Sequence, residues 1–167
     1  PYSILRTADQ HVSAGKDPKA VVQSLGADDI SLFDSLRPCQ RKVAGAMEER
    51  MMGIAGCGEG KTQTALQWGQ SLLEDDAVDQ LIFAMPTQVT SNNLLLELTG
   101  QTDPDGFAHV PPEKAGLYHG GSDAFFETNT AYEAEQELDT DGLSTKSRWF
   151  QSSVTVTTVD HVLATLV

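Results

Sequence analysis

The chain has 167 residues, with 11 Lys or Arg against 24 Asp or Glu, so its formal net charge at pH 7 is −13. This length suits one domain with a sizeable core. The negative charge argues against a protein that binds nucleic acid through a broadly basic surface. It allows contacts made by loops and main-chain groups, and it also fits a protein of a salt-rich cytoplasm. Because no apolar stretch approaches the roughly 20 residues of a membrane span, we expect a cytoplasmic protein without membrane contact.

The first third of the chain predicts a lead-in, a helix and a strand. Residues 1–36 have weak helical stretches broken by glycine and proline, which is typical of a linker from a preceding domain. Pro38 suits the first turn of a helix, which we expect over 38–50. The apolar run 51–55 predicts a short buried strand.

Strands and helices alternate in the rest of the chain, which favours an α/β fold with a mainly parallel sheet flanked by helices. Ser91 or Thr90 is expected to cap a helix that Gly100 ends. The polar, acidic segment 122–147 predicts a solvated helix with a mobile tip. We expect helices over 61–73 and 91–99, buried strands over 80–85, 115–119 and 153–158, and a last helix from Val159 or Asp160.

A glycine-rich loop, residues 55–60, lies between the first predicted strand and the helix that starts with Lys61-Thr62. Its glycines permit backbone angles that turn successive N–H groups inward, and the helix adds its positive N-terminal end. The loop therefore predicts phosphate binding, with backbone donors from its last three residues. Lys61 would neutralise the β- and γ-phosphates of ATP, and the Thr62 hydroxyl would hold Mg²⁺.

Ala55 stands where the usual phosphate-loop pattern has glycine, and this variant resembles motif I of superfamily two helicases. Gln40 lies 21 residues before Lys61. At the head of a helix its carboxamide can make two hydrogen bonds to an adenine edge, and those helicases place a similar Gln at about this distance; a plain surface Gln is the alternative. The residues expected to bind ATP and Mg²⁺ are Arg37, Gln40, Gly58, Glu59, Gly60, Lys61, Thr62 and Gln63.

Polar side chains crowd the carboxyl end of the second predicted strand, in a segment that we call the polar row (residues 86–92). In an open parallel sheet, ligands bind at this edge. Short hydroxyl and amide groups suit phosphate oxygens without positive charge, although a proline stop and a capped helix would explain part of the pattern. The residues expected to line a DNA path are Pro86, Thr87, Gln88, Thr90, Ser91 and Asn92, with Thr158 and Asp160 as neighbours. Asp160 is also interpreted as the N-cap of the last helix, a role that can coexist with DNA contact.

Several segments, taken in order, resemble the Cas-three helicase–nucleases of type I CRISPR systems. The segments are the glycine-rich loop with Lys61-Thr62 and 64–66, the stretch 83–92, Leu117-Tyr118-His119-Gly120, Trp149-Phe150 and 156–163. The resemblance implies a RecA-like fold and ATP-driven movement on displaced single-stranded DNA, which the protein then degrades. It also implies recruitment by a CRISPR RNA-guided surveillance complex.

By this resemblance, 37–167 would be the N-terminal part of a first helicase lobe, incomplete at its C-terminus, and 1–36 its lead-in. The chain alone would then lack sustained ATPase activity, because the partner residues of the site would lie outside it. Two alternatives stay open. One is another superfamily two motor, such as a restriction-type translocase or an RNA helicase, and the other is a P-loop ATP-binding switch module that moves no nucleic acid.

Overall fold

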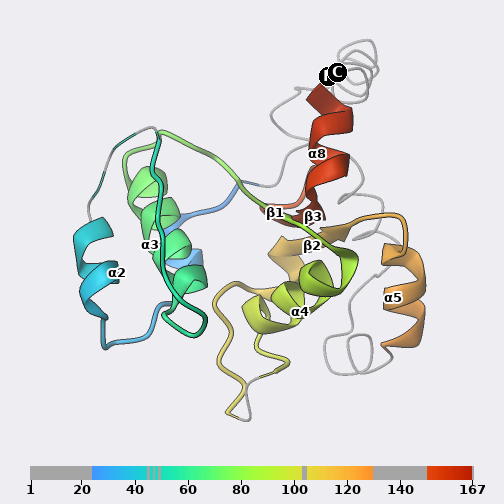
Figure 1. Cartoon of the computed structure of the whole chain (residues 1–167), viewed down its shortest axis with the longest axis horizontal. Helices are drawn as coiled ribbons and strands as arrows, with labels where there is room; N and C mark the ends of the chain where they lie inside the picture. The colour runs from blue at the N-terminus through green and yellow to red at the C-terminus, as the bar shows by residue number, and fades with distance from the viewer. Residues whose placement is uncertain are drawn as a thin grey trace.

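The computed structural model describes residues 24–44, 46, 48, 50–102, 105–129 and 150–166, coloured along the chain in Figure 1. The predictions for 1–23, for most of the acidic segment and for Trp149 lie outside these ranges. The elements in chain order are η2 (Ala27–Asp29), α2 (Pro38–Val43), α3 (Lys61–Glu74), β1 (Leu81–Met85), α4 (Gln88–Leu98), η3 (Pro112–Lys114), β2 (Ala115–Tyr118), α5 (Ser122–Thr128), β3 (Val154–Thr158) and α8 (Val159–Leu166).

The three strands form one parallel sheet in the order β1-β3-β2. Phe83 of β1 and Leu117 of β2 both pair with Val156 of β3, which fixes the register. Parallel strands need long crossover connections, and α4 supplies one of them between β1 and β2. The predicted α/β fold with a parallel sheet and flanking helices is confirmed, and the arrangement is consistent with part of a RecA-like domain.

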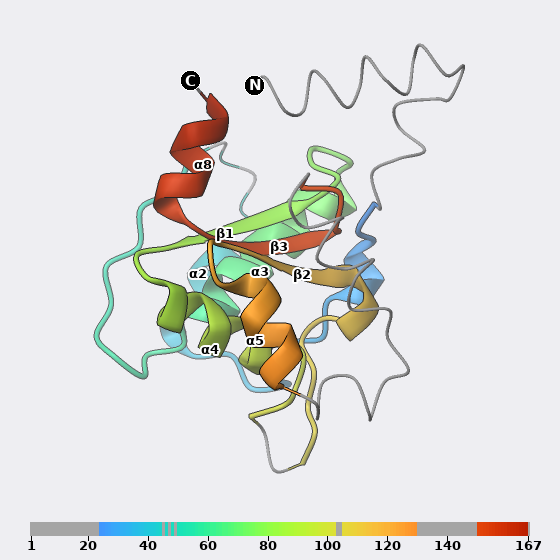
Figure 2. The ribbon, with the colours of Figure 1, turned by 90° about the vertical axis from the view of Figure 1, so that its right-hand side faces the viewer.

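The core lies between the sheet and α4, which packs against one face of all three strands (Figure 2). Leu95 and Leu98 of α4 are fully buried, as are Val154 and Val156 of the central strand. Leu66 brings α3 into the same cluster. Each such side chain contributes about 1.5–3 kcal/mol when it is fully buried, so this layer holds the carboxyl ends of the strands in place.

Strand β1 lies at the edge of the sheet, and this position corrects the prediction that it is buried on both faces. Its side chains alternate between half-buried and exposed, and Ile82 is 51% exposed. The continuous apolar run predicted a covered strand, but an edge strand with one open face has the same composition.

Two helix boundaries differ from the prediction. Helix α2 ends at Val43 rather than near residue 50, because the backbone of Ala44 leaves the helical region just before Gly45. Helix α4 begins at Gln88, three residues early, with Thr87 as its N-cap. The expected caps, Thr90 and Ser91, therefore lie inside the first turn of the helix.

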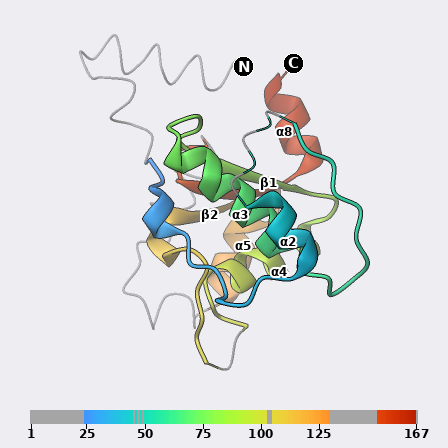
Figure 3. The same ribbon diagram turned by 90° about the vertical axis from the view of Figure 1, so that its left-hand side faces the viewer.

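The predicted strand over 51–55 is wrong. These residues form no strand, and Met52 and Ile54 are 87% and 91% exposed. The segment runs alongside α2 and α3, which lie side by side in Figure 3, and borders an apolar groove of about 490 Å³ with Val43 and Trp68. An apolar run becomes a strand only when a neighbouring strand pairs with it, and in the described sheet this segment pairs with none.

The described part of the lead-in packs against the body of the domain. Leu25 and Ile30 belong to the core cluster, and Gln70 of α3 donates its side-chain N–H to the carbonyl oxygens of Ala27 and Ile30. The domain boundary at residue 36 stays a prediction. Within the described ranges, no helix is long and apolar enough to cross a lipid bilayer.

Candidate functional site

The glycine-rich loop adopts a conformation that two of its glycines make possible. Gly58 and Gly60 have φ angles of +74° and +80°, in the left-handed region that disfavours other residues. Gly60 is also the N-cap of α3, and residues 56–59 are exposed. The loop thus brings main-chain N–H groups at the start of a 14-residue helix to the surface.

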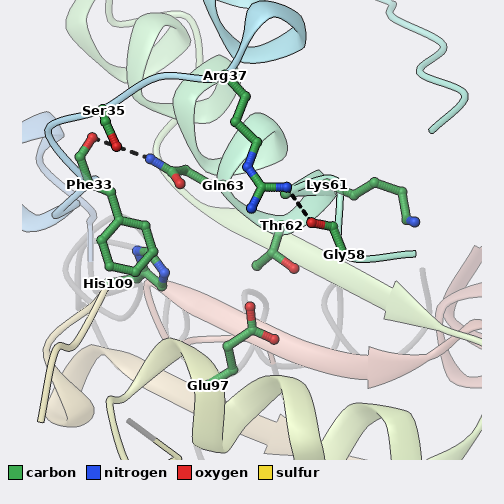
Figure 4. A pocket seen from close by; sticks show the side chains of 10 residues that line it. Phe33, Ser35, Arg37, Gly58, Lys61, Thr62, Gln63, Glu97 and His109 are labelled. Atoms are coloured by element: carbon green, nitrogen blue, oxygen red, sulfur yellow. Dashed lines mark hydrogen bonds between the residues drawn. The ribbon is translucent and has the colours of Figure 1, made fainter. Parts of the chain in front are cut away.

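Two side chains at the start of α2, those of its N-cap Arg37 and of Gln40, hold the loop in place. The Arg37 guanidinium donates a hydrogen bond to the carbonyl of Gly58 (Figure 4). The Gln40 side-chain N–H₂ group lies 3.3 Å from both the Gly60 carbonyl oxygen and Gln63 Oε1, and its Oε1 accepts from the Arg37 N–H at 2.6 Å. Gln40 is 1% exposed, so its carboxamide supports the loop. The predicted adenine contact of Gln40 has no such support and stays a prediction.

The Lys61 ammonium lies at the loop itself. Its Nζ donates to the carbonyl oxygens of Gly56 at 2.7 Å and Ala55 at 3.2 Å. The residue is exposed, and in Figure 4 its side chain extends away from Gln63 and His109. A lysine in this place can exchange two neutral carbonyl partners for an anionic one.

A cavity of about 440 Å³ opens beside the loop, a volume typical of small-molecule sites. Thr62 lines it, and the opposite wall comes from Phe33, Glu97 and His109 (Figure 4). The Phe33 ring is stacked on Phe107 at 4.5 Å and meets His109 edge-on at 5.2 Å. Sequence reasoning missed this wall, because its residues come from three separate segments and none belongs to a local motif.

The donor set of this loop suits a polyphosphate. Residues 56–59 and Lys61 are exposed, the half-buried Thr62 lines the cavity, and a Cβ on Gly58 would meet no atom within 4 Å, so the loop has room for a ligand. Thr62 supplies a hydroxyl oxygen, and oxygen atoms are the ligands that Mg²⁺ prefers. Within the part of the chain that the structure describes, no group of three or more His, Cys, Asp or Glu residues could hold a metal ion by itself.

In the polar row, most hydroxyl groups are engaged inside the protein. Thr87 Oγ1 accepts from the Thr90 N–H, and Thr90 Oγ1 accepts from the Thr87 N–H, both at 3.2 Å, which closes a capping box. Ser91 is fully buried, and its hydroxyl donates to the carbonyls of Thr87 and Thr157. Thr158 is 3% exposed, with Oγ1 2.9 Å from His161 Nδ1. These hydroxyls tie α4 and α8 to the sheet.

The exposed residues of the polar row are Pro86, Thr87, Gln88 and the apolar Val89, and Asn92 is half-buried. Asp160 is exposed and lies in the first turn of α8, which begins at Val159, so its interpretation as the N-cap is wrong. A hydrogen bond from the Thr158 hydroxyl holds the pKa of the Asp160 carboxyl below its usual value.

His119 follows β2 and joins this group; it belongs to one of the segments that carry the family resemblance, but it was not among the predicted site residues. It is 3% exposed, with Nε2 2.7 Å from Asn92 Oδ1 and Nδ1 3.0 Å from the Gly121 N–H. Burial, and then repulsion by His161, lower the pKa of the His119 imidazole.

The predicted residues thus form two clusters that α4 separates. Glu97 near the end of α4 lines the cavity at the glycine-rich loop, whereas Gln88 and Asn92 lie in its first two turns. Glu97 lies nine positions after Gln88, which is about 14 Å along a helix. The loop cluster contains the predicted cofactor residues, and the strand-end cluster contains the predicted DNA residues.

A parallel sheet with a glycine-rich loop leading into a helix defines an α/β domain of the RecA-like class. The chain is 33% identical over 134 residues to a Methanocaldococcus jannaschii protein provisionally named CRISPR-associated nuclease/helicase Cas3, a match over 77% of this chain and 17% of that protein. It is 27% identical over 167 residues to the CRISPR-associated nuclease/helicase Cas3 of Methanothermobacter thermautotrophicus, over 97% of this chain and 19% of the relative.

A shorter match is to the CRISPR-associated endonuclease/helicase Cas3 of Escherichia coli. It is 43% identical over 44 residues and covers 26% of this chain and 5% of that protein. No protein-family model matches the chain. No solved structure matches it significantly. The chain spans less than a fifth of the length of these relatives, and over the matched residues it belongs to the family of CRISPR-associated Cas3 nuclease/helicases. The resemblance predicted from its motifs is confirmed.

Proposed function

We propose that this chain is the ATP-binding part of a helicase lobe that moves on single-stranded DNA during CRISPR interference. The whole protein would be a cytoplasmic ATP hydrolase that is recruited by an RNA-guided surveillance complex and unwinds target DNA for degradation. The observation that carries the proposal is the exposed glycine-rich loop. Arg37 and Gln40 bind its carbonyl oxygens, and Lys61 and Thr62 follow it in the sequence.

Each residue of the loop cluster has a role in this proposal. The backbone N–H groups of Gly58, Glu59 and Gly60 would donate to phosphate oxygens, since left-handed glycines give a loop the kind of turn that forms anion-binding sites from main-chain N–H groups. Lys61 leaves the Gly56 carbonyl and binds the outer phosphates. Thr62 would hold Mg²⁺, which supplies charge neutralisation on the transferred phosphoryl group when bound.

The strand-end cluster is the part of the proposal that concerns DNA. Gln88 and Asn92, together with main-chain N–H groups at the start of α4, offer neutral donors to a phosphate backbone. This choice of contacts is compatible with a chain of net charge −13, since it needs no basic patch.

Lys61→Ala tests the nucleotide half. We expect ATP hydrolysis by the full-length protein to fall by a factor on the order of 100 or more, since the variant loses the cation that stabilises phosphate charge. The fold should be unchanged, because Lys61 is exposed and bonds only to carbonyls of its own loop. Lys42→Ala, an exposed lysine on α2 that does not line the loop cavity, is the matched control. Equal activity in both variants would refute the assigned role.

Crosslinking to single-stranded DNA tests the motor half. A photoreactive residue at Gln88 should label DNA, and one at the exposed Glu74, the last residue of α3, should not. A switch module that moves no nucleic acid would bind ATP but label at neither position, so this experiment separates the two classes.

A further inference from the structure

The hydrogen bonds of His119 fix which of its ring nitrogens carries the proton. Nδ1 lies 3.0 Å from the Gly121 main-chain nitrogen, and a backbone N–H can only donate, so Nδ1 must be the unprotonated acceptor. A neutral imidazole then has its proton on Nε2. That nitrogen is 2.7 Å from Asn92, so Nε2–H is the donor in this second bond.

The same reasoning fixes the orientation of the Asn92 carboxamide. Its side-chain atom facing Nε2–H must be an acceptor, which is the carbonyl oxygen Oδ1. The N–H₂ group of the carboxamide is therefore the part that is turned away from His119. Asn92 is half-buried, one turn after the exposed Gln88, whose carboxamide lies close to Gly121: a Cβ on that glycine would meet Gln88 Oε1 at 3.1 Å.

We propose that His119 is a positioning residue that orients the Asn92 carboxamide so that its N–H₂ group binds a backbone phosphate of single-stranded DNA. The inference rests on the proposed function of the strand-end cluster. It adds a hydrogen-bond direction to that cluster: the Gly121 main-chain N–H fixes the protonation of the imidazole, and the imidazole makes Asn92 a donor toward its ligand. A phosphate oxygen only accepts hydrogen bonds, so the fixed orientation is the one that DNA requires.

The environment of His119 keeps this arrangement in place. Burial disfavours the charged imidazolium, and the charged form would also direct a proton at the Gly121 N–H. The titratable groups that act on the ring come from α8: His161 opposes protonation of His119 and Asp160 favours it. The neutral form is thus the form that the buried site holds.

Two asparagines that are adjacent on α4 make a matched test in the full-length protein. Asn92→Asp replaces the donor by a negatively charged acceptor, so we expect its affinity for single-stranded DNA to fall about tenfold or more, the value of one hydrogen bond to a charged group. Asn93→Asp introduces the same charge one residue later at an exposed position and should have a much smaller effect. Equal losses in the two variants would overturn the proposal.

Substitutions of His119 test positioning separately from folding. In His119→Gln the carboxamide can still donate to Asn92 and accept from Gly121, whereas His119→Leu can do neither. We expect the Leu variant to bind DNA several-fold more weakly and the Gln variant to recover most of the affinity, at temperatures where both remain folded. Equally weak binding by both variants would count against positioning.

The proton position can be read without any substitution. Long-range ¹H–¹⁵N NMR spectra of this chain at pH 7 should show the His119 proton on Nε2. A proton on Nδ1 would overturn the inference, whether or not the protein binds DNA. If the unmodified full-length protein binds no single-stranded DNA, the proposed function itself fails, and the inference fails with it. Normal DNA binding with equal effects of Asn92→Asp and Asn93→Asp sinks the inference alone.

Discussion

The glycine-rich loop and the strand-end cluster use polar groups in opposite ways. In the loop, Gly58, Glu59 and Lys61 are exposed, and the buried side chain of Gln40 supports the loop. At the strand ends, several of the groups expected to meet a ligand stabilise the fold instead. Ser91 and Thr158 are buried and form hydrogen bonds within the protein. The groups that would bind a ligand can therefore be identified from the local loop motif itself. In the polar row, only the tertiary structure shows which side chains are exposed and which are engaged inside the protein.

Alanine at Gly60 should have the largest effect on stability and would test how tightly the loop is built. A Cβ there would lie 2.6 Å from Gln40 Nε2, and φ is +80°, so we expect the free energy of unfolding to fall by about 1–3 kcal/mol. Chemical denaturation measures the loss. Gly53→Ala is the control, because a Cβ at Gly53 meets nothing within 4 Å. Equal stability of the two variants would mean that the loop is not held against α2.

Ser91→Ala and Gln88→Ala should give opposite results, with effects of intermediate size. The first removes a buried hydroxyl that bridges α4 and β3, so unfolding should require about 1 kcal/mol less while DNA affinity stays unchanged. The second removes an exposed carboxamide, so DNA affinity should fall with little change in stability. The comparison between the two kinds of polar group breaks down if Ser91→Ala weakens DNA binding at unchanged stability.

The smallest expected effect is a dependence of stability on pH that comes from His119. Burial lowers its pKa in the folded state below the ordinary value near 6.5, so the unfolded chain takes up a proton first as the solution is acidified. Stability from this group is therefore complete above about pH 6.5 and declines as the pH falls from there toward the folded-state pKa. Urea midpoints at pH 7.5 and 5.5 should differ less in His119→Gln than in the unmodified chain. An identical decline in both would exclude His119 as the source.

Long, strongly patterned segments were predictable from the sequence. The helix that starts at Lys61 and the strands at 81–85 and 154–158 were expected within a residue or so, because apolar periodicity and the residues that begin or end an element are local. The membership of the Cas3 family followed from motifs in a fixed order, and the comparisons confirmed it. The roles of the loop residues in binding ATP stay predictions of the same local kind.

Tertiary structure decided what depended on neighbours in space. The apolar run 51–55 had the composition of a buried strand, but a strand needs a partner, and pairing is not encoded in the run itself. The far wall of the loop cavity, with Phe33 and His109, assembled from separate segments. The polarity of Asn92 was likewise set by an imidazole 27 residues away, because hydrogen-bond direction depends on which groups the fold brings within about 3 Å of each other.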